Sequence, residues 1–345
     1  MRRLAFLDAL RGVALILMVL NHTSRDWMDG AVMGWGRYYL VYATLLFPAP
    51  LFLFLVGFCL PLAPPARPAA YLRRGLVIVG AGYLLNVLVQ PGQPWWVGGV
   101  LQTIGLGIML LGPARPLLHR RWARWALVAL ATGGYVAFAA SVPVLAAWSA
   151  SHPVAGRALF NDFAPWPWLS VAIIGLVLGR TWLEARARGR DAETRFFTYV
   201  AAVGMLVAIA CVAGEWWAPT RLPFGFRRDL VLNNHWTPRA ATTLLIIAGV
   251  AALLAGAYRL MELGHRQLTW LVILGRTALM LYVVHQLIES TLVQKALGLR
   301  FNDWWLYLVA NAMFLVVLVY LGRAWLGIKA WRASRRASPT AIEKS

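Results

Sequence analysis

Long apolar segments separated by short polar ones run along the whole chain. Ten of these segments have about 15 to 25 residues, close to the length that a helix needs to cross a bilayer. Their approximate limits are 4–23, 38–62, 74–90, 96–111, 124–147, 166–182, 196–216, 240–261, 268–292 and 304–326. Pro48 and Pro50 are expected to kink or break the second segment, because proline removes backbone donors. The pattern predicts an all-α polytopic membrane protein with about ten transmembrane helices.

The composition agrees with this class of protein. Of the 345 residues, 60% have apolar side chains and only 13% are charged, and the mean hydropathy is +0.64. Cys59 and Cys211 lie in apolar segments and predict neither a disulfide framework nor a metal site. The N-terminus resembles a signal peptide, but Asp8 and Arg11 interrupt it and no small-residue cleavage site follows. We therefore expect an uncleaved first span.

The basic residues indicate how the chain is oriented in the membrane. The net charge is +20, yet the cations recur in alternate loops rather than in one basic domain, which argues against a nucleic-acid partner. If the N-terminus is cytoplasmic, 22 of the 33 Lys and Arg residues fall in inside segments and nine in outside segments, while Arg11 and Arg276 lie within spans. The positive-inside rule thus predicts that both termini are cytoplasmic. We expect one transmembrane domain over residues 1–327 and a basic cytoplasmic tail over residues 328–345.

The first apolar segment carries an arginine and a histidine. Ten residues separate Arg11 from His22, so on a helix both side chains lie on one face, roughly 16 Å apart along the axis. In the orientation above, Arg11 lies near the inner membrane surface and His22 near the outer one. Ionisable residues inside spans are usually functional. Two structural roles stay open, because Arg11 can pair with Asp8 and reach the surface, and His22 can be an interfacial residue.

Six segments together resemble one family of membrane enzymes. They are LDALRGVALILMVLNH (7–22), FPAPLFLFLVGFCL (47–60), GGVLQTIGLGIML (98–110), PWPWLSVAIIGLVLGR (165–180), NNHW (233–236) and LGRTALMLYVVHQLIE (274–289). In this order they resemble the heparan-α-glucosaminide N-acetyltransferase-like proteins and their bacterial relatives. This family is a branch of the acyltransferase-3 superfamily, whose first helix carries an Arg, ten residues and a His. The resemblance implies acetyl-CoA or another acyl-CoA as donor, with its phosphates near Arg11, Arg73, Arg74 or Arg276, and a sugar as acceptor.

Two histidines are the candidates for proton transfer. Acyl transfer needs a base that deprotonates the acceptor, and an imidazole suits this step at neutral pH, so we predict His22 as the base. In the segment 268–292, Tyr282, His285 and Glu289 share one helical face. Glu289 can orient His285 through one ring nitrogen and leave the other for proton transfer. A structural hydrogen bond between helices is the alternative role of His285.

Further polar residues are expected to contact the acceptor at the outer side. Polar side chains in a bilayer tend to face the interior of a helix bundle, so Asn21, Asn86, Gln102 and Asn311 are expected to converge with the two histidines. Loops on the same side add donors and one carboxylate, although a solvated loop explains the longest of them equally well. The predicted acceptor contacts are Asn21, Gln102, Asp162, Arg227, Arg228, Asn233 and Asn234.

These observations together predict a membrane-embedded acyltransferase, most simply an acetyltransferase, that needs no metal. It would move an acyl group from cytoplasmic acyl-CoA to a hydroxyl or amine of an extracytoplasmic sugar or glycan, in a bacterial inner membrane. Homodimer formation stays open, as does the choice between direct transfer and an acyl-histidine intermediate. The alternative is a transporter of a lipid-linked sugar or small anion, although no internal repeat and no carboxylate at a span centre are visible. A scaffold protein would leave the Arg and His pair unexplained.

Overall fold

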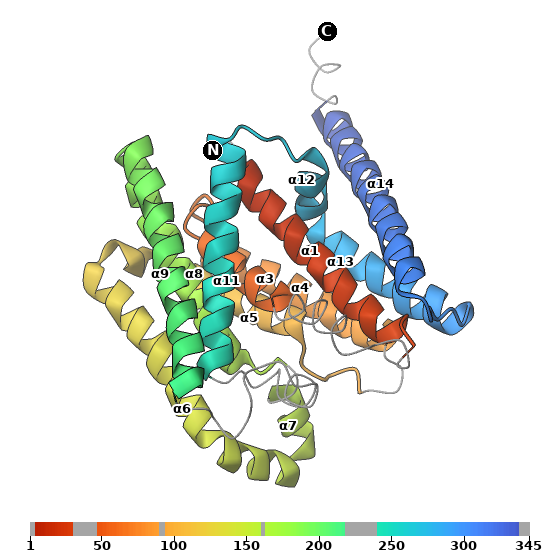
Figure 1. Ribbon diagram of the computed structural model, residues 1–345, viewed down its shortest axis with the longest axis horizontal. Coiled ribbons are helices and arrows are strands. Elements are labelled where there is room, and N and C mark those ends of the chain that lie inside the picture. The colour runs from red at the N-terminus through yellow and green to blue at the C-terminus, as the bar shows by residue number, and fades with distance from the viewer. Residues whose placement is uncertain (1–3, 30–46, 90–93, 160–162, 218–239, 338–345) are drawn as a thin grey trace. The chain divides into compact units, whose positions relative to one another are not determined.

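The computed structural model describes residues 4–29, 47–89, 94–159, 163–217 and 240–337 (Figure 1). The described residues form helices joined by short connections, with one isolated bridge between Met28 and Phe301. The prediction of an all-α protein is therefore confirmed for this part of the chain. The helices are α1 (Ala5–Asp26), α3 (Pro48–Cys59), α4 (Pro68–Val89), α5 (Val100–Ala114), the 3-10 helix η1 (Arg115–His119), α6 (Arg121–Ser151), α7 (Pro153–Leu159), α8 (Pro165–Ala187), α9 (Arg190–Trp217), α11 (Ala240–Tyr258), the π-helix η2 (Arg259–Leu263), α12 (Thr269–Arg276), α13 (Ala278–Gln286), the π-helix η3 (Leu287–Ala296) and α14 (Trp304–Ala337).

Among the described residues, five helical stretches are long and apolar enough to cross a membrane, and a bent pair of helices is a sixth candidate. The five stretches are Ala5–Ser24, Pro68–Val89, Val100–His119, Trp168–Ala187 and Trp304–Arg335. Helices α6, α9 and α11 cover three more of the predicted spans, and α3 is a shorter apolar helix. Ten spans and cytoplasmic termini thus stay predictions. Helix α14 continues beyond residue 327, so the first ten residues of the predicted tail are helical.

Two predicted spans differ in shape from what the pattern suggested. The span predicted over 268–292 breaks at Thr277, and its halves Thr269–Arg276 and Ala278–Ala296 are bent by 79°. The Thr277 hydroxyl donates to the carbonyl oxygen of Ile273 over 2.7 Å and so satisfies a carbonyl at the break. In the second span, Pro48 begins α3 rather than kinking it, because the first turn of a helix tolerates a residue without an N–H.

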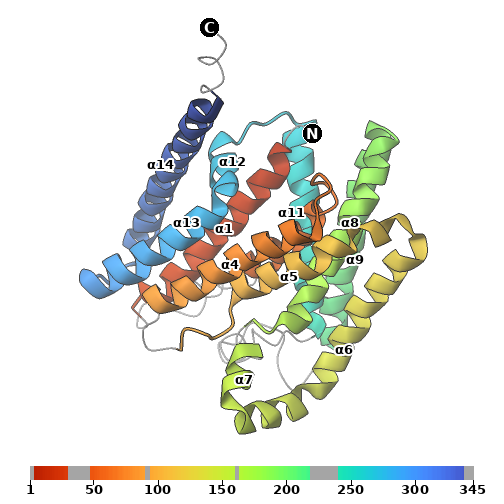
Figure 2. The same cartoon turned by 180° about the vertical axis from the view of Figure 1, so that it is seen from behind.

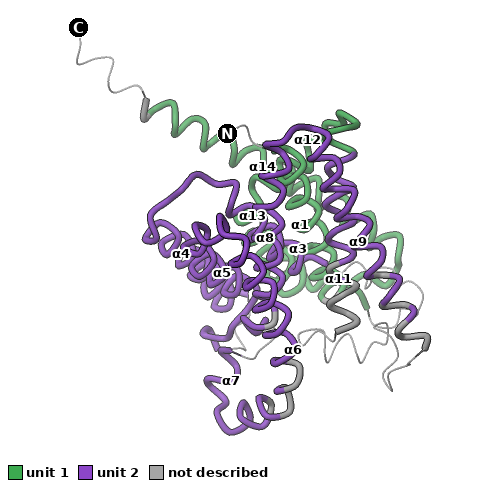
Figure 3. The backbone as a smooth tube through the Cα atoms, turned by 90° about the vertical axis from the view of Figure 1, so that its left-hand side faces the viewer, with its two compact units in different colours: residues 1–41, 260–345 green, residues 42–259 purple. Residues whose placement is uncertain are grey.

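The chain divides into two compact units (Figure 3). Unit 1 contains residues 1–41 and 260–345, and in it α1 packs against α12, α13, η3 and α14. Two glycines allow α1 and α12 to approach closely. A Cβ atom at Gly12 would meet the carbonyl group of Leu271, and one at Gly275 would meet the carbonyl of Asp8. Small residues at such contacts are typical of helix pairs in membranes.

Unit 2 contains residues 42–259, where α3 packs on α8, α4 on α5, α6 on α8 and α9 on α11. Figure 2 shows α4 and α5 running side by side. Gly175 and Gly179 of α8 lie four residues apart and face α3, so that a Cβ on either would meet the carbonyl of Phe54 or Phe58. The ring of Phe58 stacks on Trp182, and both side chains are fully buried.

Three segments of unit 2 meet at one end of the unit: the turn after α3, the region from η1 to the start of α6, and the end of α8. The predicted topology places all three on the same side of the membrane. Arg115, at the start of η1, donates to the carbonyl oxygens of Pro61 and Ala63 in the turn after α3. Arg124, near the start of α6, pairs with both carboxylate oxygens of Glu184 near the end of α8. These contacts place the three segments at a common end, as the predicted alternation of loops requires.

Candidate active site

Arg11 forms an ion pair within its own helix. Its Nη1 donates to Asp8 Oδ1 over 2.6 Å, three residues earlier on α1. The Arg11 side chain is one-third exposed, whereas the Asp8 side chain is 10% exposed. The pairing that the sequence offered as the structural role of Arg11 is therefore present, and it offsets the charge of both groups inside the helix.

The break after α12 brings a second cation to the same part of α1. Arg276 directly follows Gly275, whose backbone lies against Asp8. Arg276 is exposed, and its side chain makes no hydrogen bond or ion pair with another residue of the described ranges. Of the four cations predicted to bind the donor, Arg11 and Arg276 thus lie near one another in unit 1.

The C-terminal part of α1 meets α13 at a pair of histidines. The rings of His22 and His285 are 5.4 Å apart between centroids and nearly perpendicular, at 74°. Gln286 Nε2 lies 3.4 Å from His22 Nε2, and an amide nitrogen can only donate, so Nε2 of His22 is the acceptor. This tautomer keeps the lone pair of His22 on Nε2, the nitrogen that could take a proton. At 3.4 Å the contact is long and easily replaced.

His285 is held in one orientation by its own helix. Its side chain is fully buried, and Nδ1 lies 3.0 Å from the carbonyl oxygen of Leu281, which can only accept. Nε2 therefore carries the lone pair, and it has no hydrogen-bond partner among the described residues. The backbone of Leu281, rather than the expected Glu289, fixes this ring. Glu289 follows in η3 and is 1% exposed.

A buried polar network anchors the residue next to His22. The Thr23 hydroxyl donates to Asn311 Oδ1 over 2.7 Å and lies 3.2 Å from the Tyr307 hydroxyl, both on α14. None of the three side chains is more than 2% exposed. One turn further, Trp27 Nε1 donates to the backbone oxygen of Glu289 over 3.4 Å. The last turns of α1 are thus bonded to two other elements of unit 1.

The predicted site residues are divided between unit 1, unit 2 and the residues outside the described ranges. Asn311 accepts a hydrogen bond from Thr23, the residue after His22, and it was one of the polar residues expected near the two histidines. Arg73 and Arg74 are exposed on α4 of unit 2. Gln102 of unit 2 donates to the carbonyl of Val97 over 3.5 Å. Five predicted acceptor contacts lie outside the described residues; they are Asp162, Arg227, Arg228, Asn233 and Asn234.

Sequence reasoning did not single out Gln286, Thr23 or Tyr307. Gln286 and Thr23 each follow a histidine of the pair directly, and Tyr307 precedes Asn311 by one helical turn inside an apolar segment. Polar neighbours of an intramembrane histidine were therefore a usable signal. Within the described part of the chain, no three His, Cys, Asp or Glu side chains are grouped as a metal ion would require.

Chemically, the paired histidines offer a lone pair beside an amide donor at one end of α1. Such a group can accept a proton from a hydroxyl or amine and hold it through the reaction. Asn21 lies one residue before His22 at partial exposure, so a polar molecule that reaches His22 also meets an amide. The cations of Arg11 and Arg276 lie toward the other end of the helix, as binding of an anionic co-substrate there would require.

Comparison with known families found one match. A family model described as "heparan-alpha-glucosaminide N-acetyltransferase, catalytic" matches residues 3–218, well over half of the chain. The match contains Arg11 and His22 and ends before α11, so His285 and Gln286 lie outside it. A comparison with curated proteins gave no match.

Proposed function

We propose, from the premise that the chain belongs to the heparan-α-glucosaminide N-acetyltransferase catalytic family, that it acetylates a sugar or glycan across a membrane. The family match and the apolar helices support a multi-pass membrane protein that belongs to a family of acetyltransferases. In the proposed reaction the donor is acetyl-CoA or another acyl-CoA on the cytoplasmic side. The acceptor is a hydroxyl or amine of an extracytoplasmic sugar, and the membrane is the bacterial inner membrane.

The observation that carries the proposal is the contact between His22 and the His285–Gln286 pair. Two elements that are far apart in sequence place two imidazoles and an amide in one cluster, in which His285 and Gln286 are buried and His22 is half-buried. Burying polar groups among apolar helices costs free energy unless they are hydrogen-bonded, and ionisable groups that are retained there usually have a function. A lone pair on His22 Nε2, held by a weak and replaceable contact, is the arrangement that a base requires.

The reaction balances with His22 as the only proton acceptor. The acceptor hydroxyl or amine replaces Gln286 at His22 Nε2, gives up its proton there and attacks the thioester carbonyl. The carbon–sulfur bond breaks and the thiolate of coenzyme A leaves. The proton held on His22 then moves to this thiolate, so that free coenzyme A and a neutral His22 are formed. The hydrogen bond to the Leu281 carbonyl fixes the ring of His285, and its edge-to-face contact with the ring of His22 would then hold His22 in position.

The donor is proposed to lie along α1, with its phosphates toward Arg276. Arg276 is the stronger candidate of the nearby pair, since Arg11 is already paired with Asp8. The distance along α1 from Arg11 to His22, roughly 16 Å, is one that the flexible pantetheine arm of coenzyme A has to bridge. Arg73 and Arg74 of α4, in unit 2, stay candidates for the same role.

The decisive experiment measures acetyl transfer by the intact protein in nanodiscs. Radiolabelled acetyl-CoA is supplied with a panel of amino sugars and glycans, and the labelled product is identified. His22→Ala should lower turnover about 100-fold or more, the usual range for a positioned base. His285→Ala should be milder. The matched control is His152→Ala, because His152 is an exposed histidine of unit 2 outside the cluster.

Two further measurements separate the mechanisms. Each variant is compared with wild type in detergent melting temperature, because a buried histidine also contributes to packing. Incubation with acetyl-CoA alone, followed by acid quenching and peptide mass spectrometry, distinguishes direct transfer from an acetyl-His22 intermediate. A folded His22→Ala protein with undiminished turnover would refute the assignment of the base.

A further inference from the structure

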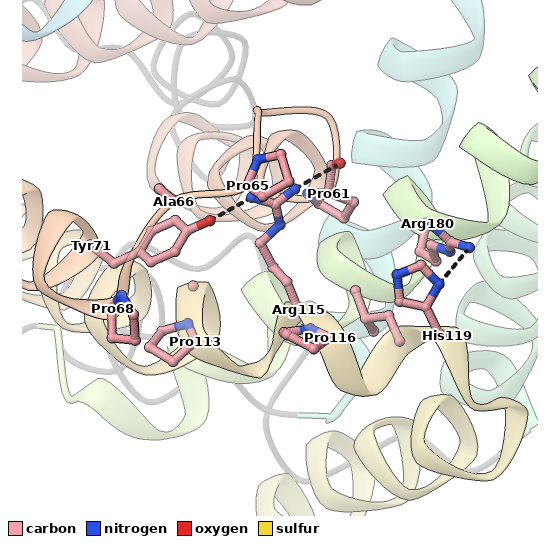
Figure 4. A pocket seen from close by; sticks show the side chains of 12 residues that line it. Pro61, Pro65, Ala66, Pro68, Tyr71, Pro113, Arg115, Pro116, His119 and Arg180 are labelled. Atoms are coloured by element: carbon pink, nitrogen blue, oxygen red, sulfur yellow. Dashed lines mark hydrogen bonds between the residues drawn. The ribbon is translucent and has the colours of Figure 1, made fainter.

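A cavity of about 250 Å³ opens at the end of unit 2 where its segments are joined by arginines (Figure 4). Its wall is formed by the turn after α3, the first turns of α4, the junction of α5 with η1, and α8. The volume is slightly below that of sites for drug-sized ligands, so the cavity fits a headgroup or part of a nucleotide. The polar lining groups are Tyr71, Arg115, His119 and Arg180.

Proline residues make the rim of this cavity rigid. Five prolines line it, with fixed φ angles and no N–H donors. Arg115 holds the turn in place, because its Nη1 donates to the Pro64 carbonyl and to the Tyr71 hydroxyl and its Nη2 to the carbonyls of Pro61 and Ala63. Four of its five N–H groups are therefore used by the protein itself. The cavity exists without a ligand to shape it.

Arg180 has donors left over. Its Nε donates to Glu184 Oε1 over 3.2 Å, and its Nη2 donates to His119 Nδ1 over 3.3 Å. Of its five N–H groups, three have no acceptor among the described residues. The Arg180 side chain is 25% exposed, and Figure 4 shows it beside His119 on one wall of the cavity. A ligand with several acceptor oxygens would use these donors.

The charge around the cavity is positive, and none of the described residues that line it carries a carboxylate. Arg115 and Arg180 line the cavity, and Glu184 pairs with Arg180 and with Arg124. The cation of Arg115 is satisfied only by carbonyl and hydroxyl oxygens, so its charge is solvated but not neutralised. The four groups together carry a charge of +2, which a dianionic phosphate would offset.

From these observations we infer that the cavity is a binding site for a phosphate ester, with Arg180 as its main donor. The apolar proline faces would contact the group that the phosphate is attached to. The same chemistry fits a soluble nucleotide phosphate and the headgroup of an anionic lipid. The inference depends on unit 2 alone and does not require His22 to be a base.

The test uses the intact protein in nanodiscs of phosphatidylcholine. In one arm, adenosine 3′,5′-bisphosphate is titrated at constant ionic strength and binding is followed by calorimetry. In the other arm, phosphatidylglycerol is added to the nanodiscs and lipid retained on the protein is counted by native mass spectrometry. Binding in either arm identifies the source of the phosphate. Neither readout needs acetyl transfer, so failure here is distinct from failure of the proposed function.

Two variants of Arg180 and one control make the test specific. Arg180→Gln should weaken binding about tenfold or more, the range for hydrogen bonds to a charged group. Arg180→Lys should weaken it less, because it keeps the charge paired with Glu184 but loses the forked donor geometry. Arg121→Gln removes an exposed cation two residues after the lining residue His119 and should change affinity by less than about threefold, because exposed charges are screened.

Three results would overturn the inference. One is the absence of binding to wild type in both arms. Another is equal binding by wild type and Arg180→Gln. The third is a loss in Arg121→Gln as large as that in Arg180→Gln, which would indicate general attraction to a basic surface. Arg180→Lys guards against misfolding, since it retains the ion pair with Glu184.

Discussion

The close contact of α1 with α12 can be tested with one pair of glycine substitutions. Gly12 and Gly327 both lie inside helices of unit 1, so replacing either with alanine gives the same gain in helix propensity, about 1 kcal/mol. At Gly327 the new Cβ has nothing within 4 Å. At Gly12 it would overlap the carbonyl oxygen of Leu271 and lie 3.0 Å from the carbonyl carbon. Those atoms belong to the backbone and cannot rotate away.

The expected difference follows from these two environments. Overpacking of this kind costs about 1–3 kcal/mol. Gly12→Ala should therefore be less stable than Gly327→Ala by about 1 to 3 kcal/mol, because the helix-propensity gain is the same in both variants and cancels in the comparison. Gly275→Ala should resemble Gly12→Ala, because its Cβ would meet the carbonyl of Asp8. The double variant should lose less than the sum, since one separation of the helices relieves both contacts.

The assay is equilibrium unfolding of the purified protein in mixed micelles with increasing denaturing detergent. Free energies of unfolding are compared for wild type, Gly12→Ala, Gly275→Ala, the double variant and Gly327→Ala. Equal stability of Gly12→Ala and Gly327→Ala would refute the close approach of α1 to α12. It would also remove the argument that Arg276 lies near Arg11.

Two further predictions concern α1. Thr23→Val should lower the free energy of unfolding by about 1–2 kcal/mol and reduce turnover, because it leaves Asn311 Oδ1 buried without its 2.7 Å donor. Thr23→Ser keeps the donor and should stay near wild type in melting temperature and turnover. Equal losses in the two variants would contradict the proposed role of the Thr23 hydrogen bonds. Arg11→Gln should destabilise the protein by on the order of 1–3 kcal/mol, because the carboxylate of Asp8 loses its 2.6 Å partner. Adding Asp8→Asn should restore most of that stability, and a raised KM for acetyl-CoA that persists in the double variant would assign Arg11 to the donor site rather than to the ion pair alone.

The sequence predicted the class of fold because apolar segments of spanning length are a strong signal. Helices occupy nine of the ten predicted spans wholly or in large part, and the second span contains the shorter α3. The break at Thr277 was missed, since the apolar run continues on both sides and only Gly275, Arg276 and Thr277 interrupt it. A hydropathy average passes over three such residues, although the hydroxyl of Thr277 bonds back to the Ile273 carbonyl, a contact that often accompanies a bend in a helix.

Only the part of the site that lies on a single helix could be predicted from the sequence. Spacing on one helix placed Arg11 and His22 on a common face, and it also offered Asp8 as the partner of Arg11. Contacts between helices carry no such local signal, so the approach of Gln286 to His22 could not be read from the sequence. The expected role of Glu289 was replaced by the Leu281 carbonyl, because a histidine can bond to its own preceding helical turn.

Unit 1 is assembled from the beginning and the end of the chain, and this has a consequence for biosynthesis. His22 leaves the ribosome about 260 residues before His285, which at 5–20 residues per second is roughly 13 to 50 s. During that interval α1 resides in the bilayer without α12, α13 or α14. The pair of Asp8 and Arg11 is internal to α1, so it can neutralise the nascent helix before any partner arrives. The hydrogen bond from Thr23 to Asn311 can form only after α14 has been synthesised. The helix that is inserted first is therefore also among the last to make all of its tertiary contacts.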